Sequence, residues 1–280
     1  MKIRSLLAVT LISAAALLPP FASAQVAISP PLANISLNTP AKPHAFRLMN
    51  DSHDPMRVAV TVVNWSMDEH GKIGTIPPTE QSLAPWIQIN PTQFTIAPGQ
   101  SQVVRYAIRP AVPLAPGEHR AMVFFTQQPT AADTAKSASL HVYFRLGAAI
   151  YGHMGPVHAS GKVARLTSDA HDATFVLHNT GNATTRMLGQ YALWTRAAWP
   201  GAGKAIDIAQ LRQRFHAAAG LLQYGRLPKD AVLPGTRRIV VLPFSKPGLP
   251  PGRYVLQVSG KLGDRVIQRT LSFDVARARH

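Results

Sequence analysis

Histidine is the residue type in this sequence with the clearest capacity for chemistry. The chain has 11 histidines and no cysteine, which excludes thiol nucleophiles and cysteine-ligated metals. His153 and His158, and likewise His171 and His178, lack metal-ligand spacing with nearby carboxylates. No HExxH, GxSxG or phosphate-binding glycine loop occurs. We therefore predict no catalytic residue, no metal site and no cofactor, and a protein that is not an enzyme.

The N-terminus has the pattern of a secretory signal. Lys2 and Arg4 precede an apolar stretch over residues 6–18, and Ala22 and Ala24 provide small residues for cleavage. The pattern predicts a signal peptide over residues 1–24 and an exported mature chain starting near Gln25. An uncleaved anchor is the alternative, but a membrane span needs about 20 apolar residues.

Positive charge is concentrated in the second half. The net charge is +16. Residues 25–150 hold 9 basic and 7 acidic residues, whereas residues 151–280 hold 18 and 6, a net charge of +12. This asymmetry predicts an anionic partner for the second half. Nucleic acid is excluded because an exported protein rarely meets it, which leaves an anionic envelope surface or an acidic protein face. The alternative is that the charge only maintains solubility.

The secondary structure is expected to consist of short segments in which apolar and polar residues alternate, separated by turns that contain proline and glycine. Expected strands cover 45–49, 57–63, 86–89, 102–108, 121–126, 140–150, 173–178, 237–242, 253–260 and 265–275. Period-two alternation with intervening turns is typical of antiparallel β-sandwiches or barrels. We predict an all-β protein of two domains, 25–150 and 151–280, divided near Gly152 and Pro156.

One segment of the second half has helical spacing. Ile206, Leu211, Phe215 and Leu222 recur at intervals close to those of a helix face. We predict a short helical insertion over residues 206–222, with an irregular excursion or a partner-binding element as alternatives.

Several ordered segments resemble the periplasmic pilus-assembly chaperones (PapD-like). The likeness rests on FRLMNDS at 46–52, WIQINP at 86–91, FTIAPGQ at 94–100, PLAPGEHR at 113–120 and LHVYFRLGAAI at 140–150, with weaker matches at 177–182 and 232–235. The resemblance implies two immunoglobulin-like β-sandwich domains in a boomerang arrangement and a periplasmic location. It also implies binding of secreted subunits that lack their own last strand.

In that family the last strand of the first domain is lent to the subunit, by edge pairing and by insertion of apolar side chains. Carried onto this sequence, the subunit-binding donor residues are Leu140, His141, Val142 and Phe144. The loop before them, residues 127–139, is mostly Ala, Thr, Ser and Gln, so the donor side chains are fewer or smaller than usual.

The resemblance also implies charged residues between the domains. Arg145 resembles the family's arginine in an interdomain or cleft ion network, with Glu118 or Asp264 as its acidic partner and Arg120 beside Glu118. The family's basic anchor for the subunit carboxylate has no counterpart on the first strand, residues 28–34, and His141 stands at the second anchor position.

The resulting functional prediction is a periplasmic chaperone for pilin-like or coat-like secreted subunits, which it delivers to an outer-membrane usher. The alternatives are a structural or adhesive surface protein, or a cell-envelope binding module, built on the same two-sandwich scaffold.

Overall fold

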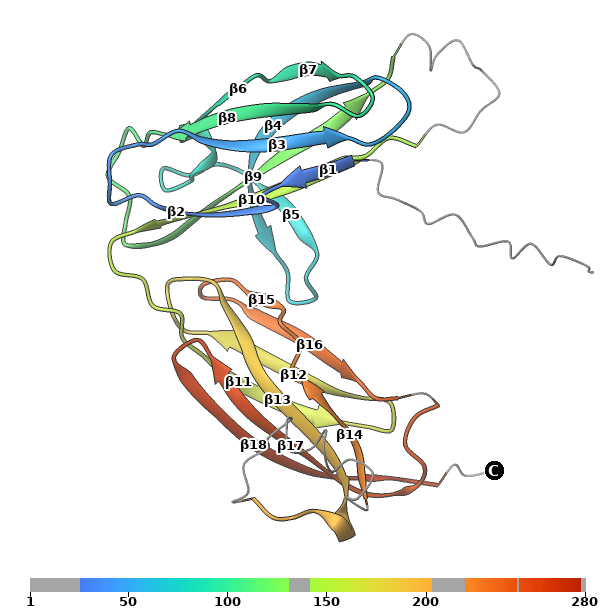
Figure 1. Cartoon of the computed structure of the whole chain (residues 1–280). Coiled ribbons are helices and arrows are strands. Elements are labelled where there is room, and N and C mark those ends of the chain that lie inside the picture. The colour runs from blue at the N-terminus through green and yellow to red at the C-terminus, as the bar shows by residue number, and fades with distance from the viewer. Residues whose placement is uncertain (1–25, 131–141, 203–219, 246, 278–280) are drawn as a thin grey trace, which may run out of the picture.

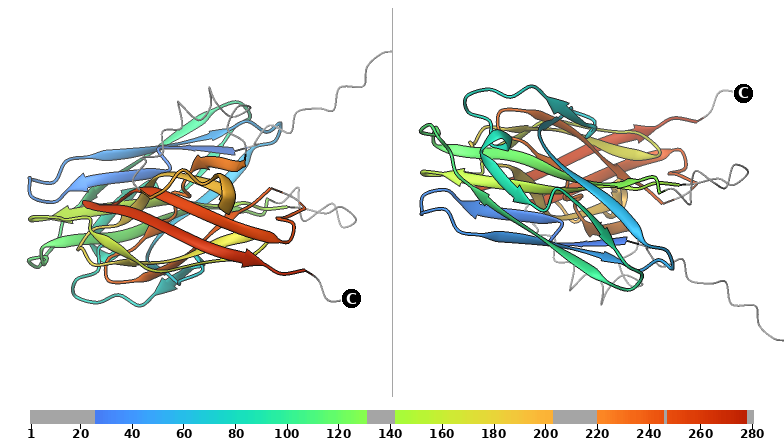
Figure 2. Two further views of the ribbon diagram at one scale, coloured as in Figure 1. Left: turned by 90° about the horizontal axis from the view of Figure 1, so that it is seen from below. Right: turned by 90° about the horizontal axis from the view of Figure 1, so that it is seen from above.

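The computed structural model describes residues 26–130, 142–202, 220–245 and 247–277, and these form two β-sandwiches. Figure 1 shows the two sandwiches one after the other, at an angle. Figure 2 shows the same chain from below and from above. The predicted all-β class with two sandwich domains in a boomerang arrangement is confirmed. The predicted signal peptide lies outside the described residues.

The first domain pairs a four-stranded sheet, in the order β1-β3-β8-β6, with a sheet in the order β2-β10-β9-β4-β5, in which β7 also pairs with β4. All its strand pairs are antiparallel except β10 with β2. Its strands are β1 (Val26–Ser29), β2 (Leu32–Ser36), β3 (His44–Asn50), β4 (Met56–Met67), β5 (Ile73–Ile76), β6 (Ile87–Asn90), β7 (Gln93–Ile96), β8 (Ser101–Ile108), β9 (Gly117–Gln128) and β10 (Arg145–Met154).

The second domain pairs a three-stranded sheet, β11-β12-β16, with a sheet in the order β14-β13-β17-β18, in which β15 also pairs with β13. Its strands are β11 (Gly161–Ser168), β12 (Asp172–Asn179), β13 (Thr185–Thr195), β14 (Leu221–Arg226), β15 (Ala231–Val232), β16 (Arg237–Pro243), β17 (Gly252–Leu262) and β18 (Arg265–Val275). Two 3₁₀ turns complete the elements, η1 (Ala84–Trp86) and η2 (Arg196–Ala198).

Two sequence predictions need adjustment. β10 continues to Met154, so a domain boundary at residue 150 falls inside a strand, and we place the boundary at residues 155–160. The helix predicted over residues 206–222 lies mostly outside the described residues. Its last two residues, Leu221 and Leu222, belong to strand β14.

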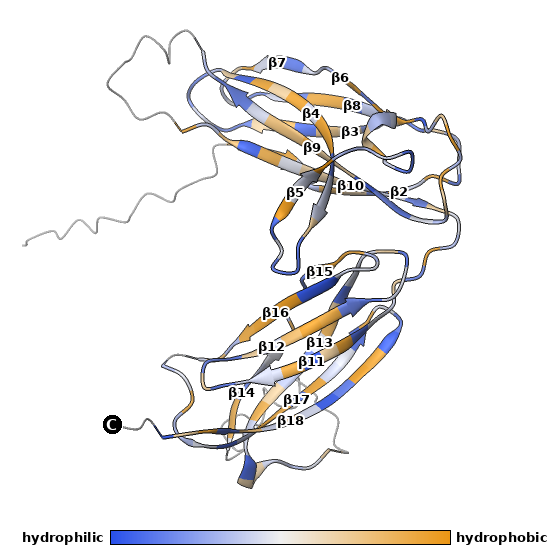
Figure 3. Cartoon of the chain, turned by 180° about the vertical axis from the view of Figure 1, so that it is seen from behind, coloured by the Kyte–Doolittle hydropathy of each residue, from blue (hydrophilic) through white to orange (hydrophobic). Residues whose placement is uncertain are grey.

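Each sandwich holds its own apolar core, as the alternation along the strands requires. In the first domain Phe46 and Leu48 of β3 meet Phe125 of β9 and Ile150 of β10, and all four are fully buried. Phe46 stacks on Tyr106 at 4.8 Å between ring centroids and meets Phe125 edge-on at 5.8 Å. Hydrophobic and hydrophilic residues accordingly alternate along the strands of both domains (Figure 3).

Tyr106 gives the first domain an expected sensitivity to alkali. Burial raises the pKa of its hydroxyl to about 12 from the ordinary value of 10.0. The unfolded chain therefore releases this proton first, so the stabilisation is complete below pH 10 and is lost between about pH 10 and 12. Alkaline denaturation monitored by tyrosinate absorbance is expected to show a steeper loss of stability in wild type than in Tyr106→Phe. Equal slopes would contradict this.

Candidate functional site

The first half of strand β10 is an open sheet edge. β10 pairs with β9 along its whole length, from Arg145 opposite Thr126 to Met154 opposite Gly117. Its other side is covered by β2 only from Ala149 to His153. Within the described ranges, no strand pairs with that other side over residues 145–148.

The register identifies the backbone groups that the open edge presents. Phe144 accepts a hydrogen bond from the N–H of Gln127 at 3.0 Å, and Ala149 donates in the opposite direction, to Pro31, at 3.1 Å. Because neighbouring residues in an antiparallel pair direct their N–H and C=O groups to opposite sides, those of Arg145 and Gly147 point away from β9. They are the backbone groups free for another strand.

The predicted donor residues fall around the start of this edge. Leu140 and His141 lie outside the described residues. Val142 is 82% exposed, whereas Phe144 is half-buried and packs against the first domain's own core. Farther along, Ala148 and Ile150 are fully buried in that core. Val142 is therefore the described donor residue whose side chain is available to a partner.

An apolar patch lies beside the edge on the outer face of the same sheet. We define this outer patch as Trp65 of β4, Met122 and Phe124 of β9, and Tyr151 of β10. Met122 and Phe124 alternate with Ala121, Val123 and Phe125, which face the core, so β9 is apolar on both sides. Such a strand indicates that its outer face is also covered.

The second domain closes one end of the outer patch, and Arg145 lies at the other. Leu233, 1% exposed, inserts among Trp65, Met122 and Tyr151. At the far end the Arg145 guanidinium lies over the Phe124 ring at 3.9 Å. Burial raises the pKa of the Tyr151 hydroxyl above its ordinary value, an effect opposed chiefly by the charge of Arg186.

Glu118 links the two domains by a buried ionic and hydrogen-bond network. Its side chain is 2% exposed and accepts from Arg120 at 3.0 Å, from the Thr184 N–H at 2.7 Å and from the Thr184 hydroxyl at 2.6 Å. His153 Nε2 lies 3.7 Å from the same carboxylate. The Glu118 N–H also donates to Asn182 O at 2.9 Å. Glu118 and Arg120 of the predicted network are thus adjacent at the domain junction.

Arg145 and Asp264 do not join this network, which corrects the predicted pairing. The β9–β10 register places His153 opposite Glu118, whereas Arg145 lies opposite Thr126 at the other end of the strand. Asp264 is exposed in the β17–β18 turn, where its N–H donates to Ala159 O at 2.8 Å. The resemblance placed Arg145 at the position of the family arginine, but β10 continues for nine residues beyond it before reaching the domain junction.

A second contact between the domains comes from the β4–β5 hairpin. The Glu69 carbonyl accepts from the Ile239 N–H at 2.7 Å and from Arg238 at 3.4 Å. Arg238 also pairs with Asp230 at 3.2 Å and packs against Gly71, where a β-carbon would collide with it. Together with Glu118 and Leu233, this contact fixes the angle between the domains.

Sequence reasoning missed His153, Thr184, Arg186, Trp65 and Tyr151 at this junction. These residues come from parts of the chain that are distant in sequence from Glu118, and no local motif marks them. The alternation in β9 was the available signal, because Met122 and Phe124 make its outer face apolar.

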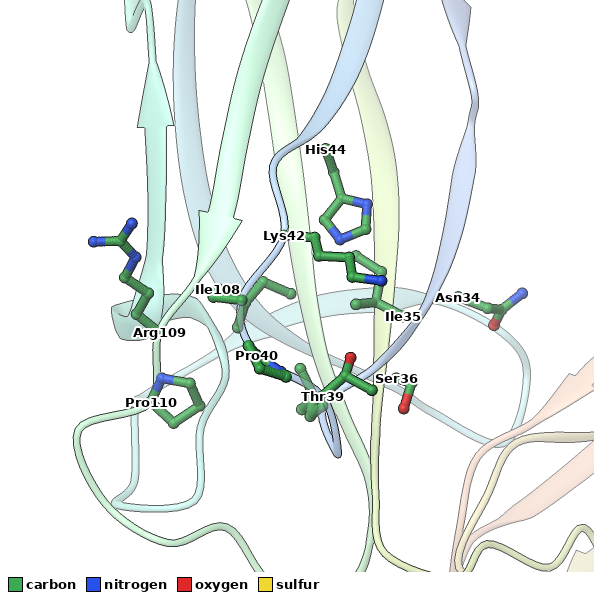
Figure 4. Close-up of a pocket in the computed structure, with 12 residues that line it drawn as sticks. Asn34, Ile35, Ser36, Thr39, Pro40, Lys42, His44, Ile108, Arg109 and Pro110 are labelled. Atoms are coloured by element: carbon green, nitrogen blue, oxygen red, sulfur yellow. The ribbon is translucent and has the colours of Figure 1, made fainter.

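Other features of the described chain lie apart from this edge. A pocket of about 440 Å³ is formed by β2, the loop after it and the end of β8, with Lys42, His44 and Arg109 in its lining (Figure 4). Within the described residues, no group of three or more His, Asp or Glu side chains could hold a metal ion. Over the same ranges there is no helix long and apolar enough to span a membrane.

Comparison with known proteins gives structural matches alone. No family model and no curated protein matches the chain. The YadV chaperone structure is 10% identical, covers 89% of this chain and all of its own (100%), and has a TM-score of 0.47. The class 5 fimbriae chaperone CfaA is 11% identical, with coverage of 90% and 100% and a TM-score of 0.47.

The Pseudomonas aeruginosa CupB2 chaperone is 10% identical, with coverage of 88% and 98% and a TM-score of 0.42. Fimbrial chaperones thus recur among the matched structures. Likeness at this level assigns no activity to the chain, so its function has to be argued from the open edge.

Proposed function

We propose that the protein is a chaperone that binds secreted, pilin-like or coat-like subunits by pairing the open edge of β10 with the strand-deficient edge of the subunit. The observation that supports this is that no described strand pairs with one side of residues 145–148, where the N–H and C=O groups of Arg145 and Gly147 are directed outward. An added strand would gain backbone hydrogen bonds there, which is the mode of β-augmentation.

The side chains around the edge supply the apolar part of the proposed contact. Val142 is 82% exposed at the start of the edge, and Phe124 and Met122 border it on the outer face. A subunit that lacks its last strand exposes an apolar groove and a bare edge, and both would be covered by this contact. The proposed role needs no cofactor, no nucleotide and no catalytic step.

The finer parts of the proposal concern location and delivery. A periplasmic chaperone would be exported by the signal predicted over residues 1–24 and would pass its subunit to an outer-membrane usher. Arg186 is exposed beside Tyr151, and it is the cation we propose for a subunit carboxylate in place of the missing first-strand anchor.

Gly147 offers a sharp test of the edge. Gly147→Pro removes the outward N–H and places the ring on the open side, whereas Gly147→Ala adds the same β-carbon but keeps the N–H. A β-carbon at this position meets the flexible end of Met122 at 2.9 Å and Phe124 at 3.2 Å, so both variants bear that cost. The two variants therefore form a matched pair for the backbone contact.

The measurement is recovery of soluble complex after co-expression with a secreted pilin-like subunit that lacks its last strand. Gly147→Pro is expected to lower recovery at least about tenfold, and Gly147→Ala by less than about threefold. Thermal unfolding of both variants verifies folding. Undiminished capture by Gly147→Pro, or a subunit equally soluble without this protein, would falsify the proposal.

A further inference from the structure

The outer face of the three-stranded sheet in the second domain carries an unusual row of basic residues. Lys162 of β11 is paired with His178 of β12, which is paired with Arg237 of β16. These residues share the outer face because His178 alternates with Leu177 and Asn179, which are buried. Side chains directly opposite on neighbouring strands have β-carbons about 5 Å apart. The two cations therefore flank the histidine in a single line.

The next rows continue the same face with one more cation and several aliphatic residues. Arg165 lies opposite Val176, which lies opposite Ile239. An irregularity in β11 between Val163 and Arg165 keeps Arg165 on the outer face. The following row joins two threonines with Val241, which is 48% exposed. The basic face consists of Lys162, Arg165, Val176, His178, Arg237, Ile239 and Val241.

Carboxylates are absent from these three rows, in which every residue is described. The first acidic residue on this face is Asp172, opposite Pro243 at the far end of the sheet, and its carboxylate accepts from Thr174. No ion pair within 4.0 Å joins Lys162, Arg165 or Arg237 to a described acidic residue, whereas the neighbouring Arg238 is paired with Asp230. The three cations are solvent-exposed and uncompensated by close partners.

Lys162 and Arg237 lie two strands apart, about 10 Å from each other, so their mutual repulsion is weak and contributes little to the stability of the domain. Mixing aliphatic residues with cations on a flat sheet face is suited to an anionic lipid surface, because the cations meet phosphates while the aliphatic side chains lose water. The excess of basic over acidic residues in residues 151–280, 18 against 6, adds long-range attraction to such a surface.

We infer that the basic face docks the protein on anionic phospholipid headgroups. This inference is independent of the proposed function, since the face belongs to the other domain and shares no residue with the β10 edge. An acidic protein is the competing partner, and the experiment separates the two.

The test is cosedimentation of the mature full-length chain with vesicles of phosphatidylethanolamine and phosphatidylglycerol, with phosphatidylcholine vesicles as the neutral comparison. The variant K162Q/R165Q/R237Q removes three charges from the basic face. The matched variant R226Q/K229Q/K261Q removes three exposed charges around the opposite sheet. Thermal unfolding of each confirms that it is folded, and the first is expected to be about as stable as wild type because its three substituted residues are exposed and make no ion pair with a described acidic residue.

Wild type is expected to bind the phosphatidylglycerol vesicles in low salt and to be released in high salt. The basic-face variant is expected to bind on the order of 100-fold more weakly, and the matched variant within about fivefold of wild type. Equal losses in the two variants would show attraction by net charge alone and would overturn the inference. So would binding to polyglutamate without binding to the vesicles. If the triple variant fails to fold, Arg165→Glu alone is expected to weaken binding in the same direction.

Discussion

Replacing Glu118 by alanine is expected to lower the free energy of unfolding by about 3–5 kcal/mol and to uncouple the two domains. Removing one partner of a buried ion pair leaves the other charge uncompensated, and Arg120 is only 18% exposed. Its Nε already has no hydrogen-bond partner, and the Trp65 ring, 5.8 Å from the guanidinium carbon, cannot replace a carboxylate. The Thr184 N–H loses its acceptor at the same time.

Loss of Glu118 should also change how the protein unfolds. Two of the carboxylate's hydrogen bonds cross from the first domain to Thr184 in the second. Without them, the domains are still joined by the backbone bond from Glu118 to Asn182, the Tyr151–Arg186 hydrogen bond, Leu233 in the outer patch, and the contacts of Glu69 with Arg238 and Ile239. Calorimetry is expected to show two clearly separated transitions in Glu118→Ala where wild type shows two overlapping transitions.

The controls separate the network from a general loss of charge. Glu80→Ala removes an exposed carboxylate and is expected to change the stability by less than about 0.5 kcal/mol. A double-mutant cycle of Glu118→Ala with Thr184→Val should give a coupling energy of about 1–3 kcal/mol, because the two residues share one network. A coupling energy near zero would mean that Thr184 and Glu118 contribute independently and that the interdomain link is not as described.

Local alternation was enough to predict most of the first domain and the core strands of the second. Strands β3, β4, β8 and β9 follow the expected ranges because their apolar residues recur at period two and one face is buried. Eight strands lie outside the expected ranges, namely β1, β2, β5, β7, β11, β13, β14 and β15, and two of them, β11 and β13, are long. β11 is interrupted by an irregularity at Val163–Arg165, and β13 contains Gly189, at φ 151°, followed by four consecutive buried residues, 191–194. Each breaks the pattern on which the prediction depends.

The site was predicted only where its residues are neighbours in sequence. Glu118 and Arg120 are two apart on one strand, so alternation alone places them on the same side. Their partners depend on the β9–β10 register and on how the second domain docks, and neither follows from a local motif. The Tyr143-Phe144-Arg145 segment was therefore placed at the junction, although the strand runs on to His153, which lies opposite Glu118.

A buried asparagine is the last residue of β3 in the first domain and of β12 in the second. Replacing either one is expected to destabilise its own domain alone. Asn179 is fully buried, donates to Ala183 O and Val232 O at 2.8 Å each, and accepts from the Gly181 N–H at 2.9 Å. Asn50 is also fully buried and donates to Asp54 O at 2.9 Å and to Ile96 O at 3.0 Å. Each amide therefore joins its own turn to a distant strand or loop.

Asn179→Ala is expected to cost about 3 kcal/mol, because two buried carbonyl groups and one N–H group lose their partner and each unsatisfied group costs about 1–3 kcal/mol, partly offset by water. Asn179→Asp is expected to cost more, since an acceptor would then face both carbonyl groups. Denaturation, followed in chains that keep only Trp194 as a signal of the second domain or only Trp86 as a signal of the first, should show only the second domain shifted by the Asn179 variants. Asn50→Ala should shift only the first.

The exposed Asn34 supplies the control, and Asn34→Ala is expected to leave both transitions within about 0.5 kcal/mol of wild type. If Asn179→Ala moved both transitions equally, the amide would be acting through the domain junction, because its turn is continuous with Asn182 and Thr184, which contact Glu118. A shift confined to the second domain would instead show that each sandwich holds its own turn independently of the domain junction.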